Sequence, residues 1–222
     1  MRRGRATSRI SWVLCLALMS LSLMLFSLSE NRYVPAHVTP HTIDLAALED
    51  ISNVSSPELV GFWSSPPRIK ICQGVNVKKS RIEKAVRFWE HLGYEFGEVY
   101  FDDGEWGSPR GCVPYPGEIA FRIAPQGMSF QAPDGSTYMA LTRMQTIVGT
   151  YELISAEIFV QYVANYEKER MVEHEIGHAL GWLHNDSSYH IMHPLWPRGG
   201  HRISGVHKTD YDVFSTLLIA QE

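Results

Sequence analysis

The sequence predicts an α+β domain, on the evidence of its apolar content, the order of its periodic segments and one histidine-rich helical motif. Apolar residues make up 45% of the 222 residues, which is enough for one hydrophobic core. Segments that alternate polar and apolar residues are typical of strands, and segments with apolar residues three and four apart are typical of helices. In chain order we expect a strand, a helix, several strands, a second helix, an irregular loop and a closing helix.

Residues 1–29 are predicted to direct the chain out of the cytoplasm. Four arginines precede a run from Ile10 to Leu28 that is almost wholly apolar or Ser. The segment is either a secretory signal peptide, with Ser27-Leu28-Ser29 as a cleavage site, or a signal anchor long enough to span a bilayer. Because the basic flank stays in the cytoplasm, the chain from Glu30 onward is expected to be extracytoplasmic, either secreted or held by a single transmembrane segment.

Residues 30–67 are typical of a linker or of a short pro-segment. Prolines recur through this stretch with Ser and Asn between them, and Leu45–Leu48 is a candidate for a short helix. The globular domain is therefore expected to occupy residues 68–222.

This domain opens with a predicted strand and an amphipathic helix. Arg68–Cys72 alternates polar and apolar residues, as a strand does. Ser80 and Glu83 form a predicted capping box at the start of the helix, and Gly93 ends it. The apolar face of this helix consists of Ile82, Ala85, Val86, Trp89 and Leu92.

Further strands and two more helices complete the expected domain. The helix that carries the histidine motif is predicted over Val163–Leu183, and a last helix is predicted to be capped by Thr209 and Asp212. The last helix has the apolar face Tyr211, Phe214, Leu217 and Leu218. The strands are expected at Glu98–Phe101, Glu118–Ile123, Tyr138–Met144 and Tyr151–Val160.

The most informative pattern is His174-Glu175-x-x-His178-x-x-Gly181-x-x-His184. His174 and His178 are four residues apart and so project from one face of a helix, where two imidazoles can hold one metal ion. Glu175 lies beside them and can reach a water on that metal. Gly181 lets the chain leave the helix, so His184 can become a third ligand. Because three protein ligands leave one tetrahedral position open, we expect one catalytic Zn²⁺.

The motif resembles the zinc-binding motif of the metzincin metalloproteases. Met192 resembles the methionine turn beneath their metal, and Met192-His193-Pro194 is closest to the Met-Tyr-Pro turn of the matrixins, with His193 in place of the tyrosine. Asn185, directly after the third histidine, departs from the common metzincin families. The resemblance implies a metzincin-like catalytic domain over 68–222, in which a twisted, mostly parallel sheet is combined with an active-site helix, a Met-turn and a C-terminal helix.

The resemblance also implies a zinc-dependent endopeptidase. Glu175 would act as general base on a zinc-bound water that attacks a peptide carbonyl, and would then return the proton to the leaving amine. A protein or peptide substrate would lie extended against an edge strand, supplied by Tyr138–Met144 or Tyr151–Val160. Pro194, Leu195 and Trp196 would line the pocket for the residue after the scissile bond.

Two other functions are compatible with the same motif. One is a catalytically inactive, zinc-stabilised binding module tethered to the membrane, although retention of Glu175 argues against it because a structural site needs no base. The other is a zinc amidase that acts on a non-protein substrate. A formal net charge of −4 and the lack of a basic stripe argue against nucleic acid as a partner. A membrane is expected as a partner only through the N-terminal segment, and the oligomeric state stays open.

The remaining candidate features are two cysteines, an acidic loop and additional histidines. Cys72 and Cys112 are expected to form a disulfide in an exported chain. Alternatively, Cys112 resembles the matrixin cysteine switch, whose thiolate caps the zinc. Asp102, Asp103 and Glu105 either bind Ca²⁺ or form a solvated loop. Histidines near the motif are expected at the surface or behind the ligands, and they are His190, His193, His201 and His207.

Overall fold

The computed structural model describes residues 40–44, 57–102, 112–132 and 134–220. The N-terminal signal or anchor segment and the helix candidate Leu45–Leu48 lie outside these residues, and both stay predictions. Among the helices described, none is long and apolar enough to cross a lipid bilayer.

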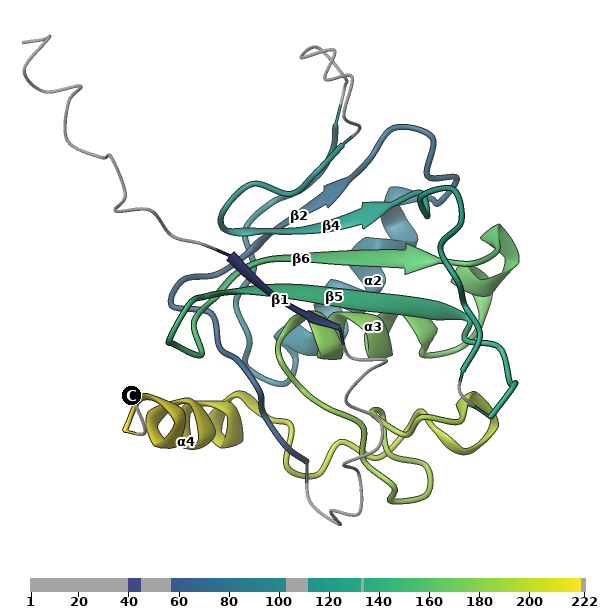
Figure 1. Ribbon diagram of the computed structural model, residues 1–222. Coiled ribbons are helices and arrows are strands. Elements are labelled where there is room, and N and C mark those ends of the chain that lie inside the picture. Colours follow the sequence, from purple (N-terminus) through teal and green to yellow (C-terminus); the bar gives the residue numbers. More distant parts are fainter. Residues whose placement is uncertain (1–39, 45–56, 103–111, 133, 221–222) are drawn as a thin grey trace, which may run out of the picture. The chain divides into compact units, whose positions relative to one another are not determined.

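The centre of the fold is one mixed sheet with the strand order β1-β5-β6-β4-β2-β3 (Figure 1). Strand β5 pairs antiparallel with both β1 and β6, whereas the other pairs are parallel, so β5 alone runs against the rest. The sheet is mixed, as expected for an α+β fold, and the metzincin-like arrangement implied by the resemblance stays a prediction. Its strands are β1 (Pro40–Asp44), β2 (Arg68–Ile71), β3 (Val99–Phe101), β4 (Glu118–Arg122), β5 (Ala140–Ile147) and β6 (Leu153–Val160).

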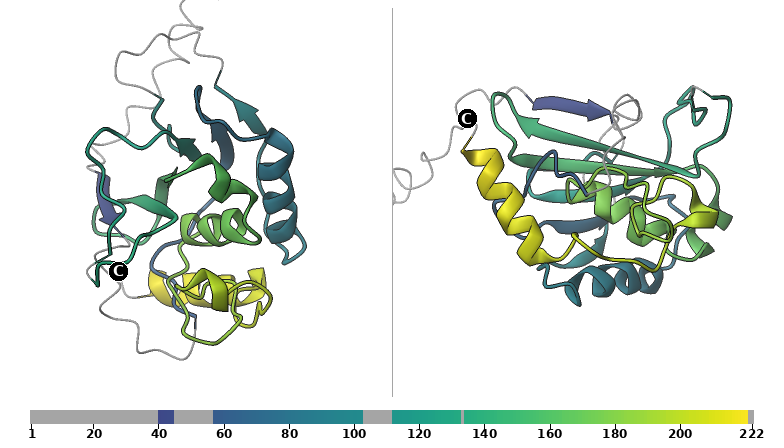
Figure 2. Two further views of the ribbon diagram at one scale, coloured as in Figure 1. Left: turned by 90° about the vertical axis from the view of Figure 1, so that its right-hand side faces the viewer. Right: turned by 90° about the horizontal axis from the view of Figure 1, so that it is seen from below.

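The helices complete an α+β fold. Helix α2 (Lys79–Glu90) and helix α3 (Met171–Ala179) lie on the same face of the sheet (Figures 1 and 2). Figure 1 shows the chain that follows α3, including helix α4 (Lys208–Ile219), below the sheet and these two helices. Two short 3₁₀ helices, η3 (Val163–Glu167) and η4 (Trp196–Arg198), flank α3 in the chain.

Burial along the strands explains this layering. Strand β4 is buried along Glu118–Phe121, as expected for a strand with neighbours on both sides and both faces covered. Strand β5 alternates buried and half-buried residues along its whole length, so one of its faces packs on the core. Trp89 of α2 is fully buried, and its Nε1–H donates to the carbonyl of Glu173 on α3 at 2.8 Å. That bond fixes the first turn of α3 against α2.

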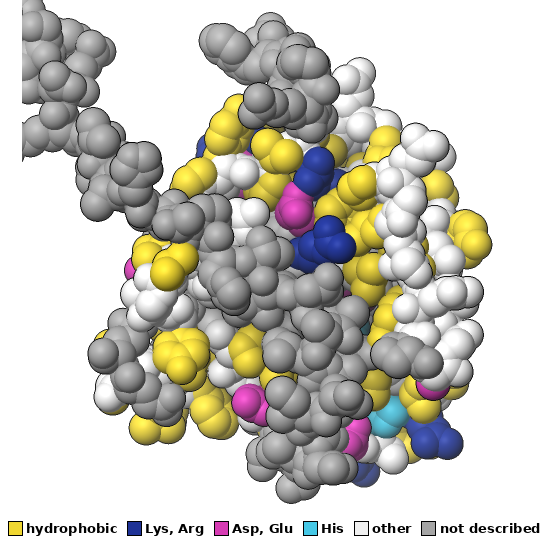
Figure 3. Space-filling view, in the orientation of Figure 1, with side chains coloured by type: hydrophobic (Ala, Val, Ile, Leu, Met, Phe, Trp, Pro, Cys, Tyr) yellow, Lys and Arg dark blue, Asp and Glu magenta, His cyan; other side chains and the backbone are white. Residues whose placement is uncertain are grey.

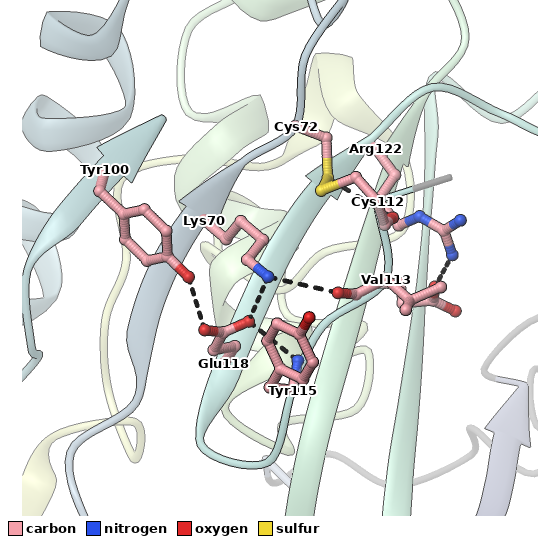
Figure 4. The surroundings of a disulfide bond; sticks show 9 residues. Lys70, Cys72, Tyr100, Cys112, Val113, Tyr115, Glu118 and Arg122 are labelled. Atoms are coloured by element: carbon pink, nitrogen blue, oxygen red, sulfur yellow. Dashed lines mark hydrogen bonds and ion pairs between the residues drawn. A yellow bond between two sulfur atoms is a disulfide. The ribbon is translucent and has the colours of Figure 1, made fainter. Parts of the chain in front are cut away.

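A disulfide and a buried ion pair stabilise the part of the sheet formed by β2, β3 and β4 (Figure 4). Cys72, directly after β2, is bonded to Cys112. Nearby, the carboxylate of Glu118 accepts from Lys70 at 2.8 Å and from the hydroxyl of Tyr100 at 2.5 Å. Burial raises the pKa of the Glu118 carboxyl, but the hydrogen bonds from Lys70, Tyr100 and the backbone N–H of Tyr115 outweigh it and hold the pKa below its ordinary value. The disulfide is the pairing expected from the sequence.

Charged and aromatic side chains also connect β4, β5 and β6. Arg122 on β4 forms an ion pair with Glu157 on β6, and its guanidinium lies 5.6 Å from the ring centre of Phe159. Arg143 on β5 approaches the same ring at 5.9 Å. Figure 3 shows basic and acidic side chains next to one another on the face seen in Figure 1, among hydrophobic side chains.

The continuous helix predicted over Val163–Leu183 is wrong. The chain forms η3, leaves helical geometry at Lys168, and begins α3 only after Arg170, whose φ is 64°. Arg170 therefore separates the two helices by its left-handed backbone. Because helical geometry is interrupted before α3, the direction of α3 is independent of that of η3. Glu173, in the first turn of α3, forms an ion pair with Arg81 at 2.8 Å.

Both predicted capping boxes are also wrong. Helix α2 begins one residue before Ser80, and its N-cap Lys78 makes no side-chain cap hydrogen bond. Helix α4 begins at Lys208, and the side chain that accepts the N-cap N–H of His207 is Asp210, at 3.1 Å. On α4 only Tyr211 of the predicted apolar face is fully buried, while Leu217 is 55% exposed.

The boundary expected between residues 67 and 68 is corrected by two segments that precede it. Pro40–Asp44 forms β1 of the sheet instead of a linker. Residues 58–62 pack on the domain, because Val60 N–H donates to Gly181 O and Leu183 N–H donates to Glu58 O, both at 2.9 Å. The globular domain thus includes part of the predicted linker.

The substitution Gly181→Ala is expected to destabilise the fold far more than Gly149→Ala. Both glycines have positive φ, 107° and 82°, but a Cβ at Gly181 would lie 2.1 Å from the carbonyl oxygen of Gly61, whereas Gly149 has open space. The backbone conformation alone costs an alanine about 1–2 kcal/mol, and the clash raises the loss at Gly181 to about 3 kcal/mol or more. Urea unfolding of both variants measures the difference, and equal losses would show that the Gly61 contact is unimportant.

Candidate metal centre

Three imidazoles converge at the end of α3. His174 and His178 project from the same side of that helix, and His184 follows the turn at Gly181. One ring nitrogen from each of the three lies within 4.8 Å of the others. The ring centres of His174 and His184 are 5.3 Å apart, and that of His178 lies 4.6 Å from each. The structure therefore brings together all three residues that the motif predicts as ligands.

Backbone carbonyls set the protonation of two of these rings. The Nδ1 of His174 lies 2.7 Å from Ile191 O, and the Nδ1 of His178 lies 2.7 Å from Trp182 O. A carbonyl oxygen can only accept, so each Nδ1 carries a proton and donates it. In the neutral rings each Nε2 is then a bare lone pair, which is the form that binds a metal.

The arrangement of these lone pairs fits a bound cation. The Nε2 atoms of His174 and His178 face each other at 3.0 Å, although neither has a proton to share. Two ligand nitrogens of a tetrahedral zinc, each about 2.0–2.1 Å from the ion, are separated by about 3.3 Å, close to this spacing. A proton between the rings is disfavoured because burial lowers the pKa of His174 to about 4 and the pKa of His178 well below its ordinary value. Burial likewise lowers the pKa of His184 to about 3.

Glu175 lies beside the triad and is held by a residue that the motif does not contain. Its side chain is buried, and burial raises the pKa of its carboxyl to about 7. The hydroxyl of Thr142, on β5, donates to Glu175 Oε2 at 2.6 Å. Thr142 is 33 residues away in the chain. The alternation along β5 places Thr142 on the buried face, but nothing in the sequence pairs it with Glu175.

Met192 packs directly against α3, the helix that carries His174 and His178. Its side chain is fully buried, and a Cβ at Gly177 would lie 2.4 Å from Met192 Sδ and 2.7 Å from Trp89 Cζ2. Gly177 lies between His174 and His178 in the chain. Only glycine at this position lets the side chain of Met192 approach α3 this closely. The interpretation of Met192 as a Met-turn stays a prediction, and the sequence pattern does not indicate the need for glycine at position 177.

Asn185 and His190 fix the loop that carries Met192. Asn185 is buried, and its backbone N–H donates to Met192 O at 2.8 Å. His190 Nδ1 accepts from the Met192 N–H at 3.1 Å, while His190 Nε2 donates to Ser204 O at 3.0 Å. Both residues therefore hold the loop between His184 and α4 through hydrogen bonds to its backbone. His193 is also buried, and its Nδ1 accepts from Leu195 N–H at 3.0 Å.

The other predicted site residues follow the Met192 turn in the chain, pair in a disulfide or lie outside the described residues. Pro194 and Leu195 are exposed after the Met192 turn, and Trp196 begins η4. Of the predicted calcium ligands only Asp102 is described, so that site stays a prediction. The cysteine-switch alternative is wrong, because the sulfur of Cys112 is bonded to Cys72. Within the described ranges, the three histidines are the one cluster able to hold a metal.

In comparisons with known proteins, the chain matches no family model and no curated protein sequence. The geometry of the site is therefore the basis for assigning its chemistry.

We predict that the chain binds one Zn²⁺ and that this binding stabilises the fold. Free zinc at 1,000 times its dissociation constant should raise the free energy of unfolding by about 4 kcal/mol. His178→Ala, which removes one of three ligands, should weaken zinc binding by roughly 100-fold or more. His201 is exposed and outside the triad, so His201→Ala is the matched control. Calorimetric titration of the two metal-free variants with zinc measures both affinities. Equal affinities would contradict the assignment of His178 as a zinc ligand.

Proposed function

We propose that the chain is a zinc-dependent endopeptidase, with His174, His178 and His184 as metal ligands and Glu175 as the general base. The observation that carries the proposal is the convergence of three imidazoles, of which His178 is buried and the other two are half-buried, on a helix that also carries the buried carboxyl group of Glu175. A closed structural zinc would require a fourth protein ligand, and the described residues supply only three. When bound, zinc would polarise a carbonyl oxygen and acidify a water molecule.

Glu175 suits the proton transfers of hydrolysis. A general base works best when its pKa lies near the working pH, and the pKa of the Glu175 carboxyl is raised to about 7. It can then accept the proton of the attacking water and return it to the leaving amine. A nearby cation favours the carboxylate, so in the zinc-loaded chain this pKa would be lower.

Thr142 orients this base. Its hydroxyl occupies Oε2 of Glu175, which leaves Oε1 to exchange the proton with water and with the leaving group. Because Thr142 belongs to β5, the sheet positions the carboxyl of a residue on α3.

The sheet topology supports an extended peptide as substrate. Of the two strands considered for the substrate edge, β6 lies between β5 and β4 and has no free side. Strand β5 also has a neighbour on each side, β6 and the short strand β1, but it is the strand whose Thr142 donates a hydrogen bond to Glu175. A peptide would pair with its outer side in place of β1. A peptide paired with β5 by backbone hydrogen bonds would lie beside the base.

The central test is hydrolysis of an unfolded protein such as casein by the zinc-loaded chain. Activity should disappear with a chelator and return with zinc, and Glu175→Gln should lower kcat by about 10²–10⁴ while zinc binding persists. Glu167→Gln, at an exposed glutamate of η3, should behave as the unchanged chain does. If Glu175→Gln keeps full activity with zinc bound, the proposed mechanism is wrong.

A second prediction concerns Thr142. Thr142→Val removes the hydroxyl with little change in volume and should lower kcat by about 10–100-fold, because hydrogen bonds to charged groups contribute about 1.5–3 kcal/mol. The Michaelis constant and zinc affinity should change little, and Thr142→Ser should restore most of the rate. Thr146→Val is the control, since Thr146 lies on the same strand and both threonines are 4% exposed. Equal losses for Thr142→Val and Thr146→Val would mean that the effect is structural.

A further inference from the structure

The outer side of β5 is occupied by the chain's own N-terminal segment. Strand β5 pairs with β6 on its inner side and with β1 on its outer side (Figures 1 and 2). Strand β1 pairs with no other strand in the described sheet and forms its end. The only backbone neighbour of β1 in this sheet is therefore the strand that also holds the base Glu175 through Thr142.

The register gives β1 a direction with respect to the site. The antiparallel pairs run from Pro40 opposite Ile147 to Asp44 opposite Arg143. Arg143 is the residue next to Thr142, whose hydroxyl binds Glu175. From its N-terminal to its C-terminal end, β1 thus advances along β5 toward the catalytic carboxyl group.

An extended substrate would need the same hydrogen-bonding groups. An unpaired strand edge is a template for another extended chain, and a bound peptide uses the backbone N–H and C=O groups of that edge. Along Arg143–Ile147, every second residue turns these groups toward β1. A peptide that binds antiparallel to β5, with the residues before its scissile bond on Arg143–Ile147, cannot do so while β1 is paired there.

We propose that β1 is a built-in competitor for the substrate-binding edge, so that peptide hydrolysis requires its displacement. This inference rests on the proposed function. It also assigns the substrate a class and a direction: an extended polypeptide, antiparallel to β5, that is cleaved beyond the position matching Asp44. Because β1 has five residues and one neighbouring strand, its release breaks a single ladder and leaves the other five strands paired.

Proline substitutions in the full chain test the competition. In an antiparallel pair, successive N–H groups of a strand point alternately toward the partner and away from it. Proline removes the backbone N–H of the residue that it replaces. Thr42 and Ile43 are consecutive, so one of Thr42→Pro and Ile43→Pro removes an N–H that bonds to β5. The other removes an N–H that points away from β5, and it is the matched control. The variant that breaks the bond to β5 should lower the Michaelis constant on the order of tenfold with little change in kcat. This is the change expected when a competing strand that occupies the site about nine-tenths of the time is released.

A cross-strand lock should have the opposite effect. Thr42 and Gln145 are direct partners, and such pairs lie close enough for an engineered disulfide. The double variant Thr42→Cys/Gln145→Cys should lose most peptide hydrolysis when oxidised and regain it on reduction. The unchanged chain under the same reductant controls for the Cys72–Cys112 bond.

Hydrogen exchange at Arg143–Ile147 supplies a readout that does not depend on activity. The releasing proline variant should lose protection at amides of β5 that face β1. If protection is lost but the Michaelis constant does not change, or if the locked chain cleaves peptides at the normal rate, β1 does not compete and the inference fails while the proposed function stands. If no variant hydrolyses any peptide with zinc bound, the proposed function itself fails, and the inference fails with it.

Discussion

The site depends on two hydrogen bonds from histidine rings to backbone carbonyls. His174 donates to Ile191 O and His178 donates to Trp182 O, and these bonds aim both Nε2 lone pairs at one point. Both acceptors lie after α3 in the chain, so the helix alone cannot make the centre. The chain must turn at Gly181 to bring Trp182 back under the helix, and the later loop must return to bring Ile191 beside His174. The positions of the three imidazoles therefore depend on this returning chain.

Aromatic residues and the segment before β2 hold the returning chain in place. Trp182 Nε1 donates to the hydroxyl of Tyr94 at 2.8 Å, and that hydroxyl donates to Val206 O at 3.0 Å. Trp63 connects the N-terminal segment to both helices of this region, since its Nε1 donates to Ala179 O at 2.8 Å and its backbone N–H donates to Tyr211 at 2.7 Å. Residues outside the expected domain boundary thus support the end of α3, and a fragment that begins at Arg68 would lack them.

Local patterns in the sequence predict the ligands and most of the strands, because helix and strand periodicities depend on neighbouring residues. The spacing of His174, His178 and His184 determines their convergence once Gly181 ends the helix. Long-range contacts have no such local signal, which is why the role of Thr142 and the approach of Met192 to Gly177 were not predicted. The break at Arg170 was missed for a related reason. Its left-handed backbone contradicts the helical propensity of its neighbours, and it occurs beside the long-range ion pair of Glu173 with Arg81.

The reversed direction of β5 connects these features. A parallel strand at this position would need a long crossover from its neighbour, whereas β5 and β6 are joined by a short turn at Val148–Glu152. The turn places β5 at the side of β6 away from β4, where it can present Thr142 to α3 and its outer backbone to another chain. The same strand therefore holds the side chain of Glu175 through Thr142 and pairs with β1 along its outer side. Pairing by β1 and support of Glu175 occur on adjacent residues of one strand, Arg143 and Thr142, so under the proposed function a chain that takes the place of β1 would lie next to the general base.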